Sequence, residues 1–170
     1  GTAYTTGYIT NDTKQDMDPT ITFDPDGNAI LVWTRNLDGE EQADLDPISW
    51  LNYQEIYYSK WNGSSWSEPQ PITNNALRDG MPHIAAVPNG KVMAVWTVDT
   101  DGNFTTWTDG EIYYSEWDGT TWTTPAPLTN DNSLDYSASV TYDSQGNAFA
   151  AWVKDGDGNF TTVSDNELYY

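Results

Sequence analysis

The chain repeats one pattern three times, and this repetition limits its fold more than any other feature. Each repeat opens at a threonine and places a tryptophan 23 residues later, inside an apolar run. Three repeats share 170 residues, so no repeat is large enough to be an independent globule, and the repeats must pack on one another. The opening threonines and their tryptophans are Thr10 and Trp33, Thr73 and Trp96, Thr129 and Trp152.

Each repeat contains four short strand candidates and little helix signal. The first strand runs into a tight turn (PDGN, PNGK or SQGN), in which glycine allows a positive φ. The second strand carries the tryptophan and is almost continuously apolar, which indicates cover on both faces. The third begins with EIYYS or ELYY, and a W-[ND]-G turn leads to the fourth around Trp66 and Trp122. The first strands are predicted over residues 20–23, 82–87 and 138–142.

These elements predict an all-β protein, a β-propeller made of four-stranded antiparallel blades. A β-sandwich is the alternative, but it does not explain repeats that stay in phase. We expect blade 1 over about residues 11–73, blade 2 over about 74–129 and blade 3 over about 130–170. The phase is broken at the termini, because the third repeat stops before its fourth strand.

The first ten residues, from Gly1 to Thr10, resemble residues 119–129, which precede the third repeat. They have the sequence of the fourth strand that blade 3 lacks. Three blades are too few for a ring. We therefore expect either that Gly1 to Thr10 of one chain completes blade 3 of another by strand exchange, or that further blades of a longer chain close the ring.

Charge and composition exclude several classes of partner. The net charge is −20, with only six lysines and arginines, which argues against nucleic acid and anionic membrane surfaces as partners. No apolar run approaches the ~20 residues of a membrane span, so we expect no membrane insertion. There is no cysteine, hence no disulfide. We expect an extracellular or cell-surface protein.

The loop between the second and third strands carries the strongest chemical signal. Two copies place oxygen-bearing side chains at positions 1, 3, 5, 11 and 13, with a glycine that allows a sharp bend. Carboxylate and amide oxygens in this arrangement suit calcium, which takes six to eight oxygen ligands. The alternative is a polar turn in which Asp and Asn cap the backbone. The predicted ligands are Asp99, Asp101, Asn103, Asp109 and Glu111 in one loop and Asp155, Asp157, Asn159, Asp165 and Glu167 in the other.

The first repeat has a degenerate copy of this loop with seven extra residues, and its candidate ligands are Asn36, Asp38, Glu40 and Glu55. The connection between repeats also recurs, and it ends at Asp16, Asp79 or Asp135. We expect these three aspartates either to cap turns or to act as ligands on the same face as the calcium loops.

Residues 59–66 (SKWNGSSW) and 115–122 (SEWDGTTW) resemble the Asp-box repeats of sialidase-like propellers, whose pattern is Ser-x-Asp-x-Gly-x-Thr-Trp. Here a tryptophan takes the third position, and Asn or Asp comes one place later. The resemblance implies a propeller in which the box is a structural turn away from the active site. The W-D-G-x-x-W run is also similar to the turn of fucose-binding lectin propellers, which bind sugar with an arginine, a glutamate and aromatic side chains.

The resemblance to sialidases would imply an arginine triad and a Tyr–Glu nucleophile pair. Arg35 and Arg78 are the only arginines, so this chain cannot supply a triad. The single histidine, His83, starts a strand, and an ordinary structural role is the simpler interpretation. We therefore expect a non-enzymatic, calcium-stabilised scaffold, adhesion or glycan-binding module. A divergent sialidase-like glycosidase fragment, or a structural subunit that assembles by strand exchange, is the alternative.

Overall fold

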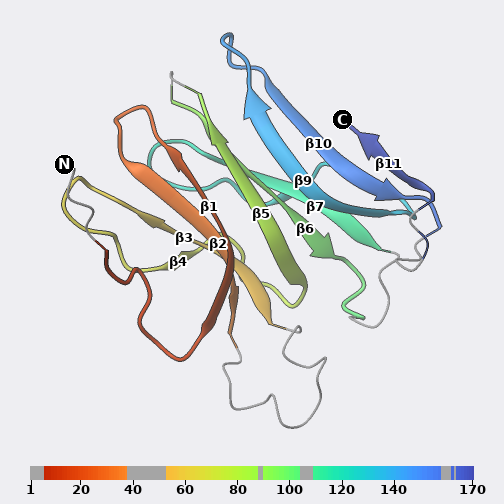
Figure 1. Ribbon diagram of the computed structural model, residues 1–170, viewed down its shortest axis with the longest axis horizontal. Helices are drawn as coiled ribbons and strands as arrows, with labels where there is room; N and C mark the ends of the chain where they lie inside the picture. The colour runs from red at the N-terminus through yellow and green to blue at the C-terminus, as the bar shows by residue number, and fades with distance from the viewer. Residues whose placement is uncertain (1–5, 38–52, 88–89, 104–108, 158–161, 163) are drawn as a thin grey trace.

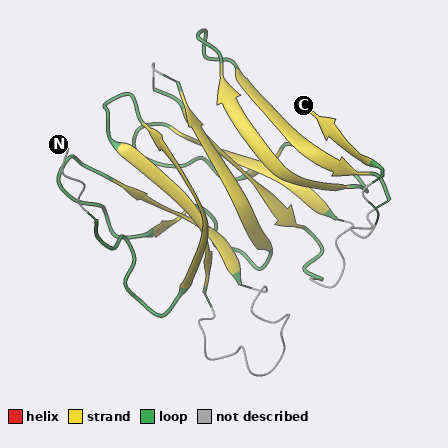
Figure 2. Ribbon diagram, in the orientation of Figure 1, coloured by secondary structure: helices red, strands yellow, loops and turns green. Residues whose placement is uncertain are grey.

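The computed structural model describes residues 6–37, 53–87, 90–103, 109–157, 162 and 164–170. Within these residues the chain consists of strands and loops (Figure 2). The described part of the chain has no helix long and apolar enough to span a membrane.

Three antiparallel sheets follow one another across the molecule in chain order (Figure 1). The first contains β1 (Gln15–Phe23), β2 (Ala29–Asn36), β3 (Gln54–Lys60) and β4 (Gln70–Pro71). The second contains β5 (Arg78–Ala86), β6 (Val92–Asp99), β7 (Gly110–Trp117) and β8 (Ala126–Pro127). The third contains β9 (Leu134–Tyr142), β10 (Ala148–Asp155) and β11 (Asn166–Tyr169).

Each sheet is built from one sequence repeat, with strands in sequential order. The all-β propeller architecture is therefore confirmed, and three sheets make part of a propeller. Successive first strands contact one another, β1 with β5 and β5 with β9. The turns between first and second strands lie along the upper edge in Figure 1, and the second strands end toward the opposite edge.

The first strand of each sheet begins earlier than the sequence predicted, because it continues through a β-bulge. The register shifts between Met17 and Thr20 in β1, and equivalent shifts occur in β5 and at the pairing of β9 with β10. A residue with positive φ lies in each bulge: Asp18 (51°), Met81 (54°) and Ser137 (54°). Three matching strained positions show that the bulge belongs to the repeat.

The core lies between neighbouring sheets. Ile30, Val32 and Ile56 of the first sheet form one cluster with apolar residues of the second. Val95 and Ile112 of the second form another with the third. Trp33 and Trp96 are buried, as the sequence predicted. Trp152 is only half-buried, because it lies in the end sheet, where its ring centre is 6.4 Å from that of Tyr169.

A hydrogen bond from the indole of each repeated tryptophan ends on the aspartate that closes the connection between repeats. Trp33 donates to Asp16 over 2.6 Å, and Trp96 donates to Asp79 over 2.6 Å. Trp152 donates to Asp135 over 2.9 Å. These aspartates therefore lie within the first strands, where they fix the polar end of a buried aromatic ring.

The two Asp-box-like runs form equivalent turns. Asn62 Oδ1 accepts the backbone N–H of Ser64 and Ser65, each over 3.0 Å. Asp118 Oδ1 accepts the corresponding N–H groups over 2.7 and 2.8 Å. Gly119 has φ +101° between them and can adopt this conformation because it lacks a Cβ. The side chain one place after the tryptophan therefore holds the turn.

Candidate metal centre

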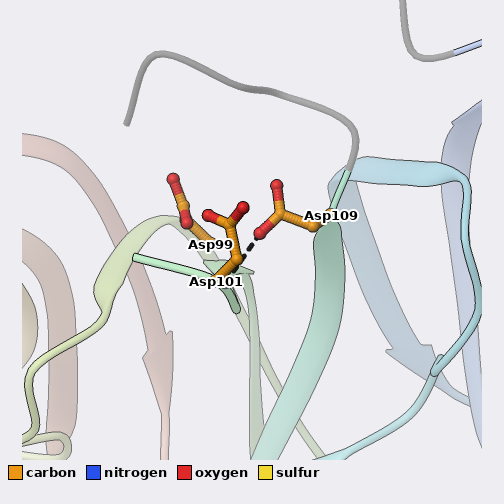
Figure 3. A group of neighbouring side chains, drawn as sticks. All are labelled: Asp99, Asp101 and Asp109. Carbon is orange, nitrogen blue, oxygen red and sulfur yellow. Dashed lines mark hydrogen bonds between the residues drawn. The ribbon is translucent and has the colours of Figure 1, made fainter. Parts of the chain in front are cut away.

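Three carboxylates converge where β6 ends and β7 begins (Figure 3). Asp99 is the last residue of β6, and Asp109 directly precedes β7. With Asp101 they place one oxygen each within 4.8 Å of the others. The Asp101 backbone N–H donates to Asp109 Oδ2 over 2.7 Å, so the loop folds back on itself at this point.

The next sheet repeats the arrangement between β10 and β11. Asp155, Asp157 and Asp165 have the same spacing and also place one oxygen each within 4.8 Å of the others. The Asp157 backbone N–H donates to Asp155 Oδ1 over 3.1 Å and to Asp165 Oδ2 over 3.2 Å. Asp155 is fully buried, so at least one member of this cluster is held away from bulk water.

Crowding of like charges alters the acidity of the first cluster. Burial raises the pKa of Asp99 to about 6, and repulsion from Asp109 and Asp101 adds to the shift. Burial and the charge of Asp101 also raise the pKa of Asp109. Each carboxylate makes ionisation of its neighbours less favourable, and a cation between them would reverse this effect.

The predicted glutamate ligands lie elsewhere. Glu111 Oε2 accepts the Thr129 hydroxyl over 2.5 Å, and its Oε1 accepts the Asp131 N–H over 2.7 Å. Glu55 Oε1 accepts the Asn75 N–H over 2.7 Å. Both glutamates begin a third strand and point to the connection that leads to the next sheet. The structure therefore does not bring them into either three-aspartate cluster.

The remaining predicted ligands are divided between the described and undescribed parts of the chain. Glu167 is exposed on β11, and Asn36 is buried at the end of β2. Asn103 adjoins the first cluster, where its backbone N–H donates to Asp101 Oδ1 over 2.5 Å. Three predicted ligands lie outside the described residues, namely Asp38, Glu40 and Asn159.

A buried pair of acids, which was not predicted from the sequence, lies between the first two sheets. Glu55 and Asp79 are both almost fully buried. Burial raises the pKa of Asp79 to about 7, with a further contribution from the Glu55 charge and partial relief from hydrogen bonds to Asn75 and Trp96. The pKa of Glu55 is also raised, mainly by burial.

The residue two places after each repeated tryptophan distinguishes Asp79 from its two counterparts. Arg35 Nε lies 3.5 Å from Asp16 Oδ1, and Lys154 Nζ lies 3.5 Å from Asp135 Oδ2. The equivalent residue in the second repeat is Val98, which carries no charge. Asp79 therefore lacks the cation that this position supplies to its two counterparts.

His83 links the second and third sheets. Its Nδ1 accepts the backbone N–H of Val140 over 3.2 Å, and burial lowers the pKa of its imidazole. This contact fits the structural role that its place at the start of a strand predicted.

Comparison with known proteins supports the fold. No model of a known protein family matches the chain, and no curated protein matches it in sequence. A Hadza microbial sialidase superposes with a TM-score of 0.63 at 15% identity, covering 91% of this chain and 37% of the sialidase. An endo-arabinase from Bacteroides thetaiotaomicron gives 0.56 at 16% identity, covering 99% of this chain and 59% of the enzyme.

An α-L-arabinanase from Penicillium chrysogenum, complexed with arabinobiose, gives a TM-score of 0.57 at 14% identity, covering 89% of this chain and 42% of the enzyme. The chain thus spans between 37 and 59% of the length of these three structures. It has the β-propeller fold of sialidases and arabinanases, as the Asp-box-like runs indicated.

Proposed function

We propose that the loops between second and third strands each bind one calcium ion, and that the ions stabilise a propeller that recognises carbohydrate. The observation that carries the proposal is the pair of matching clusters, Asp99, Asp101 and Asp109 in one loop and Asp155, Asp157 and Asp165 in the next. A single acidic cluster has many explanations, but the same three-carboxylate geometry in consecutive repeats favours a common ligand.

The chemistry of the donors suits a hard cation. Three carboxylates provide up to six oxygens, and neighbouring amide or carbonyl oxygens and water complete a shell of six to eight. Gly102, with φ +68°, permits the sharp bend after Asp101, and its N–H donates to Asp99 Oδ1 over 3.1 Å. Calcium would neutralise carboxylates that repel one another when no cation is bound. Millimolar calcium outside cells fits an extracellular location for the chain.

The proposed role is binding without catalysis. The chain offers two arginines, too few for the carboxylate-gripping triad that its resemblance to sialidases would imply. The single histidine is engaged between sheets. Exposed aromatic rings provide faces on which sugars stack, so a glycan is the proposed ligand.

Glycoside hydrolysis is the second candidate function. The structures that share the fold include sialidases and arabinanases, which favours a carbohydrate-acting protein. Hydrolysis needs a pair of carboxyl groups in defined positions, and a longer chain with further blades would supply additional candidates.

Calcium binding is tested by titrating chelated protein with calcium in a calorimeter, and by thermal melting in chelator and in millimolar calcium. We expect two ions per chain and a higher melting temperature with calcium. The double variant Asp109→Asn, Asp165→Asn should lose both effects. The matched control is Asp118→Asn, because the same turn in the first repeat already has Asn62. Equal melting temperatures with and without calcium would remove the proposal.

The two functional candidates are separated by a glycan array and a hydrolysis assay on arabinan and sialosides. Binding without release of sugar supports the module. Turnover that is lost on replacing one carboxylate pair supports the hydrolase.

A further inference from the structure

We propose that the third sheet of one chain packs on the first sheet of a second copy, head to tail, and that two such contacts close a ring of six sheets. This contact would repeat, between chains, the interface that the chain already forms twice within itself.

The outward face of the third sheet carries the residues that are buried at the internal interfaces. Ile56 of β3 is 0% exposed against the second sheet, and Tyr58 also packs there. Their equivalents in the third repeat are Leu168, which is 82% exposed, and Tyr170, which is 95% exposed. The repeat therefore places interface residues on a sheet face that the described part of the single chain leaves exposed.

The outer face of the first sheet, which we call the receiving flank, carries the residues that form the other side of the same interface. Ile84 of β5, buried against the first sheet, and Val140 of β9, buried against the second, receive the preceding sheet at the internal interfaces. The equivalent residue on β1 is Ile21, which is 56% exposed. The outer faces of the third and first sheets are different surfaces, so two copies that join them would associate head to tail.

Backbone groups provide a second match. At the edge of β7, the N–H of Ile112 donates to the Thr129 hydroxyl over 2.8 Å, and the N–H of Leu128 donates to the Ile112 carbonyl over 2.7 Å. Leu168 on β11 is the equivalent of Ile112, and Thr10 is the equivalent of Thr129. The residues that end at Thr10 in a second copy would therefore pair with β11.

Charge provides a third match. Between the second and third sheets, Lys154 Nζ lies 2.5 Å from Asp131 Oδ2, and the N–H of Asp131 donates to Glu111. A glutamate of the preceding sheet thus meets a loop that a cation already neutralises.

The first sheet presents the same loop without the glutamate. Arg35 pairs with Asp12, the equivalent of Asp131, and Arg35 is itself buried. The glutamate at the matching position of the third sheet is Glu167, which is exposed on β11. Glu167 of the second copy could therefore accept a hydrogen bond from the loop at Asp12, whose charge Arg35 already neutralises.

The shape of the first sheet agrees with this arrangement. Residues 6–9 and the side chains of Phe23, Trp61 and Trp66 line a cavity of about 700 Å³ beside the first sheet. In the second sheet, the ring of Tyr58 lies 5.6 Å from Trp117 and fills the equivalent place. Tyr170 of the second copy would occupy the cavity.

The test is the molar mass of the 170-residue chain, measured by light scattering after gel filtration at tens of micromolar. We expect twice the 19.0 kDa of one chain. Leu168→Asp should give a monomer whose circular dichroism is unchanged, because Leu168 is exposed within the single chain. Tyr53→Asp is the control, because Tyr53 is exposed and directly precedes β3, which contacts β5 within the same chain; this variant should remain dimeric.

Mixing two variants tests the head-to-tail direction. Ile21→Asp should also give a monomer, since it alters the receiving flank. Equal amounts of Ile21→Asp and Leu168→Asp retain one intact pair of flanks between unlike chains, so the mixture should recover dimers. A wild-type monomer, an open-ended series of masses, or a mixture that stays monomeric would each overturn the proposal. If the wild-type chain is a monomer, further blades of a longer chain would be the alternative cover for both outer faces.

Discussion

The buried acid pair between the first and second sheets makes the stability of this interface depend on pH. Glu55 Oε1 accepts the backbone N–H of Asn75, and Asp79 accepts the Trp96 indole and the Asn75 amide. Among the described residues, Glu55 Oε2 is buried and receives no hydrogen bond from a fixed donor. A proton shared between Glu55 and Asp79 supplies that donor and removes the repulsion of two buried charges.

The sign of the effect follows from the direction of the pKa shift. The native pair keeps its proton up to about pH 7, whereas Asp79 in the unfolded chain releases a proton near its usual pKa of 3.8. Between these values the unfolded state binds fewer protons, so the free energy of unfolding falls as pH rises. The slope for one group is at most about 1.4 kcal/mol per pH unit and falls to half of that near pH 7, so the loss between pH 5 and 7 is about 2 kcal/mol.

The substitution Glu55→Gln should remove much of this dependence. A glutamine Oε1 still accepts the Asn75 N–H, and its Nε2 donates to the Asp79 carboxylate without needing a shared proton. Burial continues to raise the pKa of Asp79, so some slope remains. From pH 5 to pH 8 we expect Glu55→Gln to retain about 2 kcal/mol of stability that the wild type loses.

Glu111→Gln is the matched control. Glu111 holds the equivalent position in the next sheet, but both of its oxygens accept hydrogen bonds, and Lys154 neutralises the neighbouring Asp131 and Asp135. Glutamine there gains no such advantage at high pH. Urea unfolding, followed by tryptophan fluorescence at pH 5, 6, 7 and 8 in chelator, measures all three proteins. Parallel pH profiles for wild type and Glu55→Gln would refute the shared-proton explanation.

Two further pairs of substitutions test the packing and the turns. Trp96→Ala should lower the free energy of unfolding in urea by about 3–5 kcal/mol, because Trp96 is fully buried. Trp152→Ala should lower it distinctly less, because Trp152 is only half-buried. Equal losses would contradict this packing. Gly119→Ala should cost about 1–2 kcal/mol through backbone strain at φ +101°. Gly27→Ala, at φ +82° in equally open space, should cost a similar amount, and no loss in either variant would argue against strain.

The repeated pattern was sufficient to predict the architecture. Apolar second strands, turn glycines and an in-phase tryptophan are local features, and local features repeated three times leave few ways to bury the apolar faces. The bulges were not predictable in this way. They occupy polar stretches that are typical of loops, two of which contain a proline, and only pairing with the second strand turns those stretches into strand.

The candidate metal centre was also predictable only in its local part. The spacing of Asp99, Asp101 and Asp109 within one loop was enough to expect them together, because a short loop brings its own side chains close. The direction of Glu111 was decided by tertiary structure, since its partners at Thr129 and Asp131 belong to the connection that leads to the next sheet. The raised pKa of Asp79 has the same origin, because burial and the Glu55 charge arise only when two sheets pack together.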